Sequence, residues 1–433
     1  MGPVPGTLLK VLVAQRSWRY RDFAAAFERA ATKVGLRNQT VSEAQFRRWT
    51  SGRVKTMPSP DACRVLESLF GMEAVALFAA PPQGVPRTVP TAYDIESEIA
   101  MTARDAADEA GAAAAQSVSD TTIDQLRDDV AALATAYATT PPFDVFRRAK
   151  GLRQDAEYQR GATRVPVQQQ ELLILAGQAC ALLSTAAFDL GALDDATRLA
   201  RSAALYGETA RFDPMRAYAA GSLAIVAYFA GRPSEAVRHV RAALAYGGLG
   251  DAGRRRLLSI AARAYGHLGD GEQAGRATVA AVGLDAGARD DLHDGVGGEF
   301  AFDEERLVMS AATTALLTGD GSRAEGQARH ALELVAGRPP ARQSGTVKAK
   351  ASADLAAALL LRGDLEAAEE ALTPVWEIPG DRRSAGLLGR VTGLRVALTA
   401  PSWRTARVAV DLGERIEDYG RLAAGRGMSA IEP

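Results

Sequence analysis

A repeated pattern built around a glycine constrains the fold of this sequence more than any other feature. In five copies, alanine follows the glycine by five residues, a small residue precedes it by seven, and a small residue follows it by twelve, with Val375 as the one misfit. The glycines are 40, 38, 50 and 44 residues apart. The copies are Ser184/Gly191/Ala196/Ala203, Ala224/Gly231/Ala236/Ala243, Ala262/Gly269/Ala274/Ala281, Ala312/Gly319/Ala324/Ala331 and Ala356/Gly363/Ala368/Val375.

This spacing predicts pairs of antiparallel helices. Glycine ends a helix in the left-handed conformation at little cost, and the small residues let two helices approach closely. One pair cannot cover its own apolar face, so successive pairs stack into a superhelix with a concave inner surface. A sixth, degraded copy spans residues 384–417, with Pro401 in the place of the glycine. No segment has strand periodicity, so we expect an all-α fold; an irregular alanine-rich bundle is the alternative.

Prolines divide the chain. Four of them between Pro81 and Pro90 remove backbone donors and predict an extended linker. We therefore expect a small helical domain over residues 1–80, a linker over 81–93, a connecting or dimerisation segment over 94–165, and the repeat domain over 166–433.

The repeat pattern resembles the tetratricopeptide repeat, with lengthened turns that account for spacings above the usual period of about 34 residues. In that family's register, the first helix of each pair lines the concave surface, and five to six pairs are present here. The register places these residues on that surface: Gln178, Thr185, Phe188, Tyr218, Ile225, Tyr228, Arg256, Ser259, Arg263, Arg306, Met309 and Lys350. Tyrosines beside arginines suit a peptide or a small acidic effector, because guanidinium groups bind carboxylates well. A solvated charged face is the alternative interpretation.

The amino-terminal 80 residues carry 12 Lys or Arg against 6 Asp or Glu, whereas the chain as a whole has a net charge of −1. Basic surface suits a polyanion such as DNA. Residues 7–16 and 20–34 have the pattern of two short helices. A third helix follows Ser42, which is a good helix cap, and its apolar face consists of Val41, Phe46 and Trp49.

This order resembles the lambda-repressor-like helix-turn-helix of the XRE regulator family. The family's recognition-helix string corresponds here to Ser42, Phe46, Trp49 and Gly52 with their intervening residues. The resemblance implies contacts to double-stranded DNA, with bases facing Glu43, Ala44 and Arg48, phosphates nearer Ser42, Arg47, Arg53 and Lys55, and Gln45 on the same exposed side. Residues 32–40 form a longer connection than that family has. A helical interaction module without a nucleic-acid role is the alternative.

The complete layout is similar to a group of actinobacterial XRE-type regulators with carboxy-terminal repeats and, more distantly, to peptide-sensing quorum regulators. That resemblance implies a homodimeric transcription regulator that senses a small molecule or a peptide, or docks a protein. The alternative is a tetratricopeptide adaptor whose amino-terminal domain contacts proteins.

Other signals are weak. We expect no enzyme activity, metal or cofactor, because the sequence has two cysteines and four scattered histidines and groups no catalytic set. The segment Gly295–Gly298 follows no predicted strand, so we interpret it as a loop and not as a phosphate-binding motif. We found no apolar run long enough to span a membrane and no secretory signal, and we therefore expect a cytoplasmic protein without membrane contact.

Overall fold

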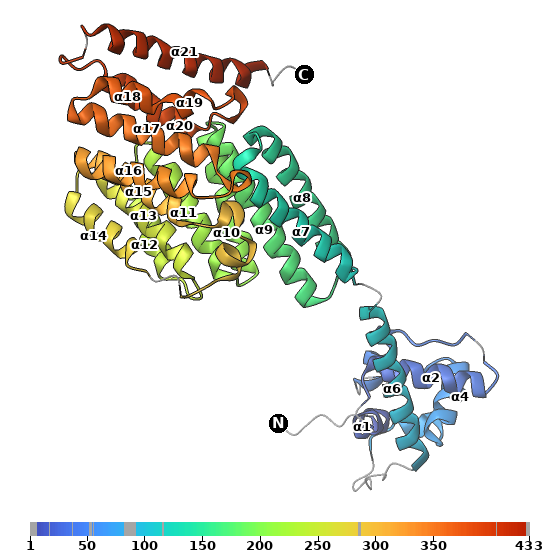
Figure 1. Cartoon of the computed structure of the whole chain (residues 1–433). Coiled ribbons are helices and arrows are strands. Elements are labelled where there is room, and N and C mark those ends of the chain that lie inside the picture. Colours follow the sequence, from blue (N-terminus) through green and yellow to red (C-terminus); the bar gives the residue numbers. More distant parts are fainter. Residues whose placement is uncertain are drawn as a thin grey trace. The chain divides into compact units, whose positions relative to one another are not determined.

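The computed structural model describes residues 7–16, 18–36, 38–51, 54, 56–81, 92–114, 117–284, 287–403 and 405–429. Within these ranges every regular element is a helix, which confirms the all-α fold class (Figure 1). The chain divides into two compact units, Met1–Asp108 and Glu109–Pro433, called unit one and unit two below.

Unit one is built from short helices around an aromatic core. Phe23 and Phe27 are fully buried, and Trp49 is 3% exposed. Side chains of Thr7, Ser42 and Ser59 accept backbone N–H groups at three helix starts, which satisfies donors that a helix leaves unpaired. The core helices are α1 (Leu8–Gln15), α2 (Tyr20–Lys33), α3 (Glu43–Thr50), α4 (Pro60–Phe70) and α5 (Ala74–Phe78). Helix α6 (Ala92–Ala114) follows and runs across the boundary between unit one and unit two.

The lengthened connection between α2 and α3 is tied down near its end. Gly35 has φ +79° and Asn38 has φ +76°, so the chain turns twice through the left-handed region. Val41 is 3% exposed, and its carbonyl accepts a 3.1 Å hydrogen bond from the Tyr20 hydroxyl. The start of α3 is thereby attached to α2.

Unit two consists of helices that pack side by side in chain order (Figure 1). It opens with α7 (Asp120–Ala136), η1 (Tyr137–Thr139) and α8 (Pro142–Ala162). The helix pairs are α9 (Pro166–Asp189) with α10 (Leu193–Thr209), α11 (Asp213–Phe229) with α12 (Pro233–Leu244), α13 (Asp251–His267) with α14 (Gly271–Val282), α15 (Glu304–Leu317) with α16 (Gly321–Ala336), α17 (Gly345–Arg362) with α18 (Leu365–Ala371), and α20 (Ala385–Ala397) with α21 (Arg407–Ser429). The remaining short elements are η2 (Asp291–Val296), η3 (Gly298–Phe300), η4 (Pro340–Arg342), α19 (Thr373–Trp376) and η5 (Gly380–Arg382). Helices α7 and α8, which we assigned to the connecting segment, pack with α9 in unit two.

The glycine pattern forms the turns that it predicts. Gly191, Gly231, Gly269, Gly319 and Gly363 have φ between +74° and +90°, and each lies between the two helices of its pair. The small and apolar residues of all five copies are at most 1% exposed. The helix-pair prediction is therefore confirmed at the level of turns and packing positions. The degraded sixth copy also forms a helix pair, with Pro401 in its connection.

The stack of helix pairs in unit two, called the superhelix below for brevity, has contacts between its early and late elements. Helix α17 packs against η1, and α20 packs against α9. Residues 287–303, between α14 and α15, also fold inward. Leu292 and Phe300 in this segment are fully buried, and the Phe300 ring lies 5.0 Å from the Tyr218 ring. Where we expected only a loop, short helical turns flank Gly297. Gly298 has φ +60°, and a Cβ there would lie 2.5 Å from the Ala134 carbonyl, so this close approach requires glycine.

Helix α9 is the one described helix long and apolar enough to cross a membrane by length and composition. Its most apolar window has a mean hydropathy of 1.6, and 72% of that window is buried inside the protein. In this structure α9 is the central helix of a packed helical layer.

Candidate functional site

Helix α3 presents one face to solvent. Its cap is reciprocal: the Gln45 N–H donates to Ser42 Oγ at 3.2 Å, and the Ser42 N–H donates to Gln45 Oε1 at 2.8 Å. On the opposite face, Trp49 packs 6.0 Å from the Phe27 ring. The exposed residues are Ser42, Glu43, Ala44, Arg47 and Arg48, while Gln45 and Phe46 are half-buried.

The two arginines on this face of α3 differ in whether an ion pair holds them. Arg47 Nη2 lies 2.5 Å from Glu43 Oε1, and both side chains are more than half exposed. Arg48 forms no ion pair with a described residue, so its guanidinium can bind a partner. Arg53 and Lys55, which we expected near phosphates, lie outside the described residues.

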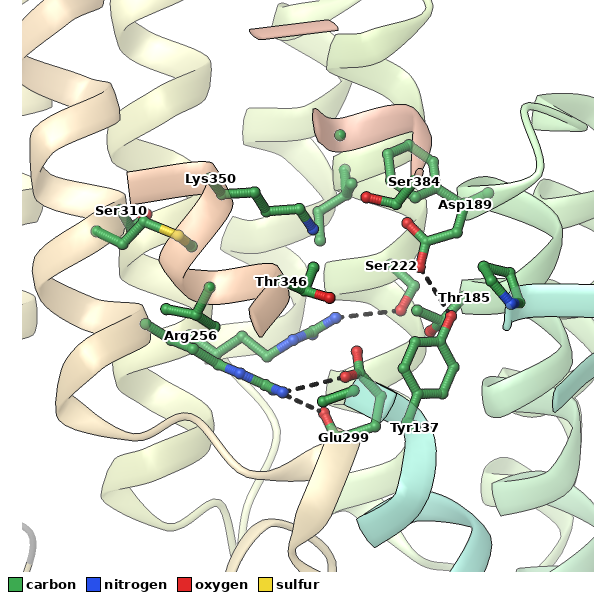
Figure 2. A pocket seen from close by; sticks show the side chains of 18 of the residues that line it. Tyr137, Thr185, Asp189, Ser222, Arg256, Glu299, Ser310, Thr346, Lys350 and Ser384 are labelled. Atoms are coloured by element: carbon green, nitrogen blue, oxygen red, sulfur yellow. Dashed lines mark hydrogen bonds and ion pairs between the residues drawn. The ribbon is translucent and has the colours of Figure 1, made fainter. Parts of the chain in front are cut away.

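Unit two contains a cavity of about 200 Å³ on the inner side of the superhelix (Figure 2). Its wall comes from the first helix of every pair, namely α9, α11, α13, α15, α17 and α20, together with η1, η3 and η5. The first helices thus face inward, as the repeat register predicts. The cavity lies where the two ends of the superhelix meet.

Most of the predicted concave-surface residues line this cavity. They are Thr185, Phe188, Tyr218, Ile225, Tyr228, Arg256, Arg263, Arg306, Met309 and Lys350. Gln178 and Ser259 do not. Gln178 is 5% exposed and lies seven residues before Thr185, which is about 10 Å further along α9. Ser259 is 4% exposed and faces a narrow gap beside α14 and α15, because α15 packs against α13 there.

Arg256 is held inside the wall. Its Nη1 donates to the Tyr218 carbonyl and its Nη2 to Ser222 Oγ, both at 3.2 Å, and its guanidinium lies 4.0 Å from the centre of the Tyr218 ring. Burial lowers the pKa of Arg256. Arg263 lies 5.5 Å from the Tyr228 ring, and its buried Nε has no hydrogen-bond partner.

Two acidic residues that the sequence analysis missed also line the cavity. Glu299 Oε2 lies 3.2 Å from Arg306 Nη2, and Arg306 also donates to the Ala301 carbonyl at 2.8 Å. The Tyr137 hydroxyl donates to Asp189 Oδ2 at 2.9 Å. Burial raises the pKa of Asp189.

Lys350 extends from α17 into the cavity (Figure 2). Its ammonium forms no hydrogen bond or ion pair with a described residue, and burial lowers its pKa. A Cβ built at Gly386 would lie 3.5 Å from Lys350 Nζ, so the glycine leaves room beside the ammonium group.

Two serine hydroxyls of the wall are also unpaired. Ser310 on α15 and Ser384 before α20 are each 2% exposed, and neither Oγ has a hydrogen-bond partner. Buried polar atoms are paired in most structures, so these two are exceptions that call for an explanation.

Sequence signals for the missed residues were limited. Asp189 directly follows Phe188, which we predicted, but the register assigned it no inward position. Tyr137 is the first residue of η1, directly after α7, and Glu299 lies in η3, in the long segment between α14 and α15. Only the closed superhelix brings these residues together.

The remaining polar clusters are structural. Asp290 accepts N–H groups from Gly250 and His293 at 2.8 Å, and His293 Nδ1 lies 2.9 Å from Asp290 Oδ2. Among the described residues, no three His, Cys, Asp or Glu side chains are grouped to hold a metal ion. Cys180 is 2% exposed, and burial raises its pKa to about 11, so its thiol is unreactive at neutral pH.

Comparison of the chain with protein-family models and with curated protein sequences identified no related protein. Function must therefore be argued from the exposed face of α3 and the cavity of unit two.

Proposed function

We propose that this chain is a sequence-specific DNA-binding transcription regulator of the XRE type, with a tetratricopeptide-like effector domain. In this proposal unit one is the helix-turn-helix domain and unit two is the receptor. The protein acts in the cytoplasm as a homodimer, because operators for such domains consist of two half-sites about one helical turn apart.

The exposed face of α3 is the observation that supports this proposal most strongly. Trp49 anchors the helix in the core, while Glu43, Ala44 and Arg48 face solvent. A helix with this arrangement can enter the major groove, where arginine distinguishes bases by pairing with guanine edges. Ser42 and Arg47 lie on the flank of the same helix, where contacts to phosphates fix the register.

Effector binding in unit two would regulate DNA binding by changing the arrangement of the dimer. A ligand shifts such an equilibrium only by its differential affinity for the two arrangements. Helix α6 is a candidate dimer contact, because Ile99 on it is 63% exposed. The carboxy-terminal end of unit two is the other candidate.

The test is selection of binding sites from a random DNA pool, followed by gel shifts at several salt concentrations. We expect one preferred sequence, and we expect Arg48→Ala to relax that preference at a cost of about 1–3 kcal/mol. The matched control is Arg29→Ala, which removes an exposed arginine on α2 and should leave the preference unchanged.

The adaptor alternative predicts a different outcome. The protein would then bind DNA without preference at every salt concentration, and Arg48→Ala and Arg29→Ala would behave alike. That result would reject the proposal.

A further inference from the structure

The cavity wall of unit two carries more positive than negative charge. Its cations are Arg256, Arg263, Arg306, Lys350, Arg382 and Arg390, and its acids are Asp189 and Glu299. Arg306 pairs with Glu299, and Arg390 pairs with Asp354 behind the wall at 2.8 Å. The other cations have no carboxylate within ion-pair distance among the described residues.

Of these unpaired cations, Arg256 is buried, and Arg263 and Lys350 are half-buried. Arg256 is 8% exposed and contacts only a carbonyl, a hydroxyl and an aromatic ring. Arg263 has an unpartnered buried Nε. Lys350 has no hydrogen-bond partner, and the nearest opposing acid, Asp189, is already hydrogen-bonded by Tyr137.

Unpaired buried charge is costly, because the protein interior solvates an ion far less well than water does. An anion in the cavity would offset that cost by pairing with the cations. It would also bind more tightly than at an exposed site, because little water competes for the cations. These observations all indicate an anionic group.

The rest of the wall is apolar. The rings of Phe188 and Phe229 meet edge to face with centroids 4.8 Å apart, and Ile225, Met309 and Val347 continue this surface. A surface of this kind suits an aromatic or aliphatic body. The anionic group is therefore attached to an organic body and is not free inorganic phosphate.

Size limits the ligand further. The volume of about 200 Å³ exceeds the roughly 150 Å³ of an engineered cavity that binds benzene, and it is below the 300–1,000 Å³ of sites for drug-sized molecules. One ring with a short side chain fits this volume.

We infer that unit two binds a small organic acid, with its carboxylate beside the Lys350 ammonium and its apolar body against Phe188 and Ile225. This inference deepens the proposed function, on which its regulatory meaning rests, because it names the chemical class of the effector. The binding itself is tested without DNA.

The first experiment is calorimetric titration of the full chain with four acids and their neutral amides. The acids are benzoate, phenylacetate, 3-phenylpropionate and hexanoate, with inorganic phosphate and tri-glutamate as further probes. We expect at least one acid to bind at least tenfold more tightly than its amide, phosphate and tri-glutamate. The inference is overturned if no acid binds, or if an amide, phosphate or tri-glutamate binds as tightly as the best acid.

The second experiment compares Lys350→Met with Lys348→Met, which removes an exposed lysine from the same helix. We expect Lys350→Met to weaken the best acid at least tenfold and to leave its amide within twofold. Lys348→Met should change neither. Equal effects of the two variants on the acid would overturn the assignment of Lys350.

Thermal unfolding of the protein without ligand separates a ligand-binding lysine from a structural one. If Lys350 is unpaired until ligand binds, Lys350→Met should raise the midpoint of unfolding of unit two. A lowered midpoint would show that the ammonium stabilises the empty protein, against the inference. If the protein binds the acid but shows no sequence-selective DNA binding, only the proposed function is rejected. If it binds DNA selectively but binds no acid, only this inference is rejected.

Discussion

Arg390 on α20 and Asp354 on α17 form an ion pair in the interior of unit two, with Nε and Oδ1 2.8 Å apart. The Thr313 hydroxyl on α15 donates to Asp354 Oδ2 at 2.7 Å and accepts from Arg390 Nη2 at 2.8 Å. Three first helices of the superhelix are thereby joined beside the cavity.

Breaking this pair should destabilise unit two strongly. Arg390→Met leaves the carboxylate of Asp354, whose side chain is 2% exposed, without its cation, which should cost about 3–5 kcal/mol. Urea denaturation measures the loss. The control is Arg395→Met on the same helix, which breaks an exposed pair with Glu417 and should cost about 0–1 kcal/mol. Equal losses would contradict the special role of the buried pair.

Two glycines of one helix pair should respond to alanine in opposite directions. Gly319 has φ +77°, so Gly319→Ala should lower the free energy of unfolding by about 1–2 kcal/mol. Gly326 is exposed inside α16 with open space around its Cβ position, so Gly326→Ala should raise that free energy by about 0.5–1 kcal/mol. Denaturation midpoints of the two variants test this, and a shift of the same sign in both would refute the conformational explanation.

Asp290 should make unit two sensitive to acid. Burial works to raise its pKa, but hydrogen bonds from His293 and Gly250 prevail and lower the pKa below the ordinary value of 3.8. Its stabilisation is therefore fully present above that value and is lost as the pH falls from 3.8 through the folded-state pKa.

Asp290→Asn should reduce stability at pH 7 and flatten the dependence of the unfolding free energy on pH as the pH falls below 3.8. Asp291→Asn, at the exposed neighbouring position, should keep the wild-type dependence. Unfolding titrations at a series of pH values measure both. A wild-type acid limb in Asp290→Asn would mean that other carboxylates are responsible.

Substitutions on the two faces of α3 should affect different properties, the inner face stability and the outer face DNA binding. Trp49→Ala removes a core side chain and should destabilise unit one by about 3–5 kcal/mol, whereas Arg48→Ala should change its stability by no more than about 0.5 kcal/mol. Amide hydrogen exchange over residues 43–78 distinguishes unit one from unit two. Loss of protection in Arg48→Ala would mean that its effect on DNA is a folding defect.

Local features of this fold were predictable from the sequence because their causes are local. A left-handed turn needs glycine at one position, as at Gly231, and close helix contact needs a small residue at another, as at Ala224. Both requirements appear in the sequence at fixed spacing. The inward position of the first helices was an expectation from the resemblance to tetratricopeptide repeats, not from these two requirements.

The composition of the cavity was only partly predictable. The register placed Gln178 and Ser259 on the inner face, but the depth of the cavity along each helix depends on which neighbours pack over it. Asp189 and Tyr137 are 52 residues apart, and Glu299 lies more than 100 residues beyond both, so contacts between distant segments bring the three together. No spacing within one helix pair carries that information.

The contacts between the early and late helices of the superhelix change how local unfolding affects the rest of unit two. In an open array each pair contacts only its neighbours, so an end pair can fray while the others stay folded. Here α20 rests on α9 and α17 on η1, so loss of the last pair removes support from the first. The helix pairs should therefore unfold cooperatively, without early fraying of either end. Truncation at one end of the stack should lower the stability of the helices at both ends.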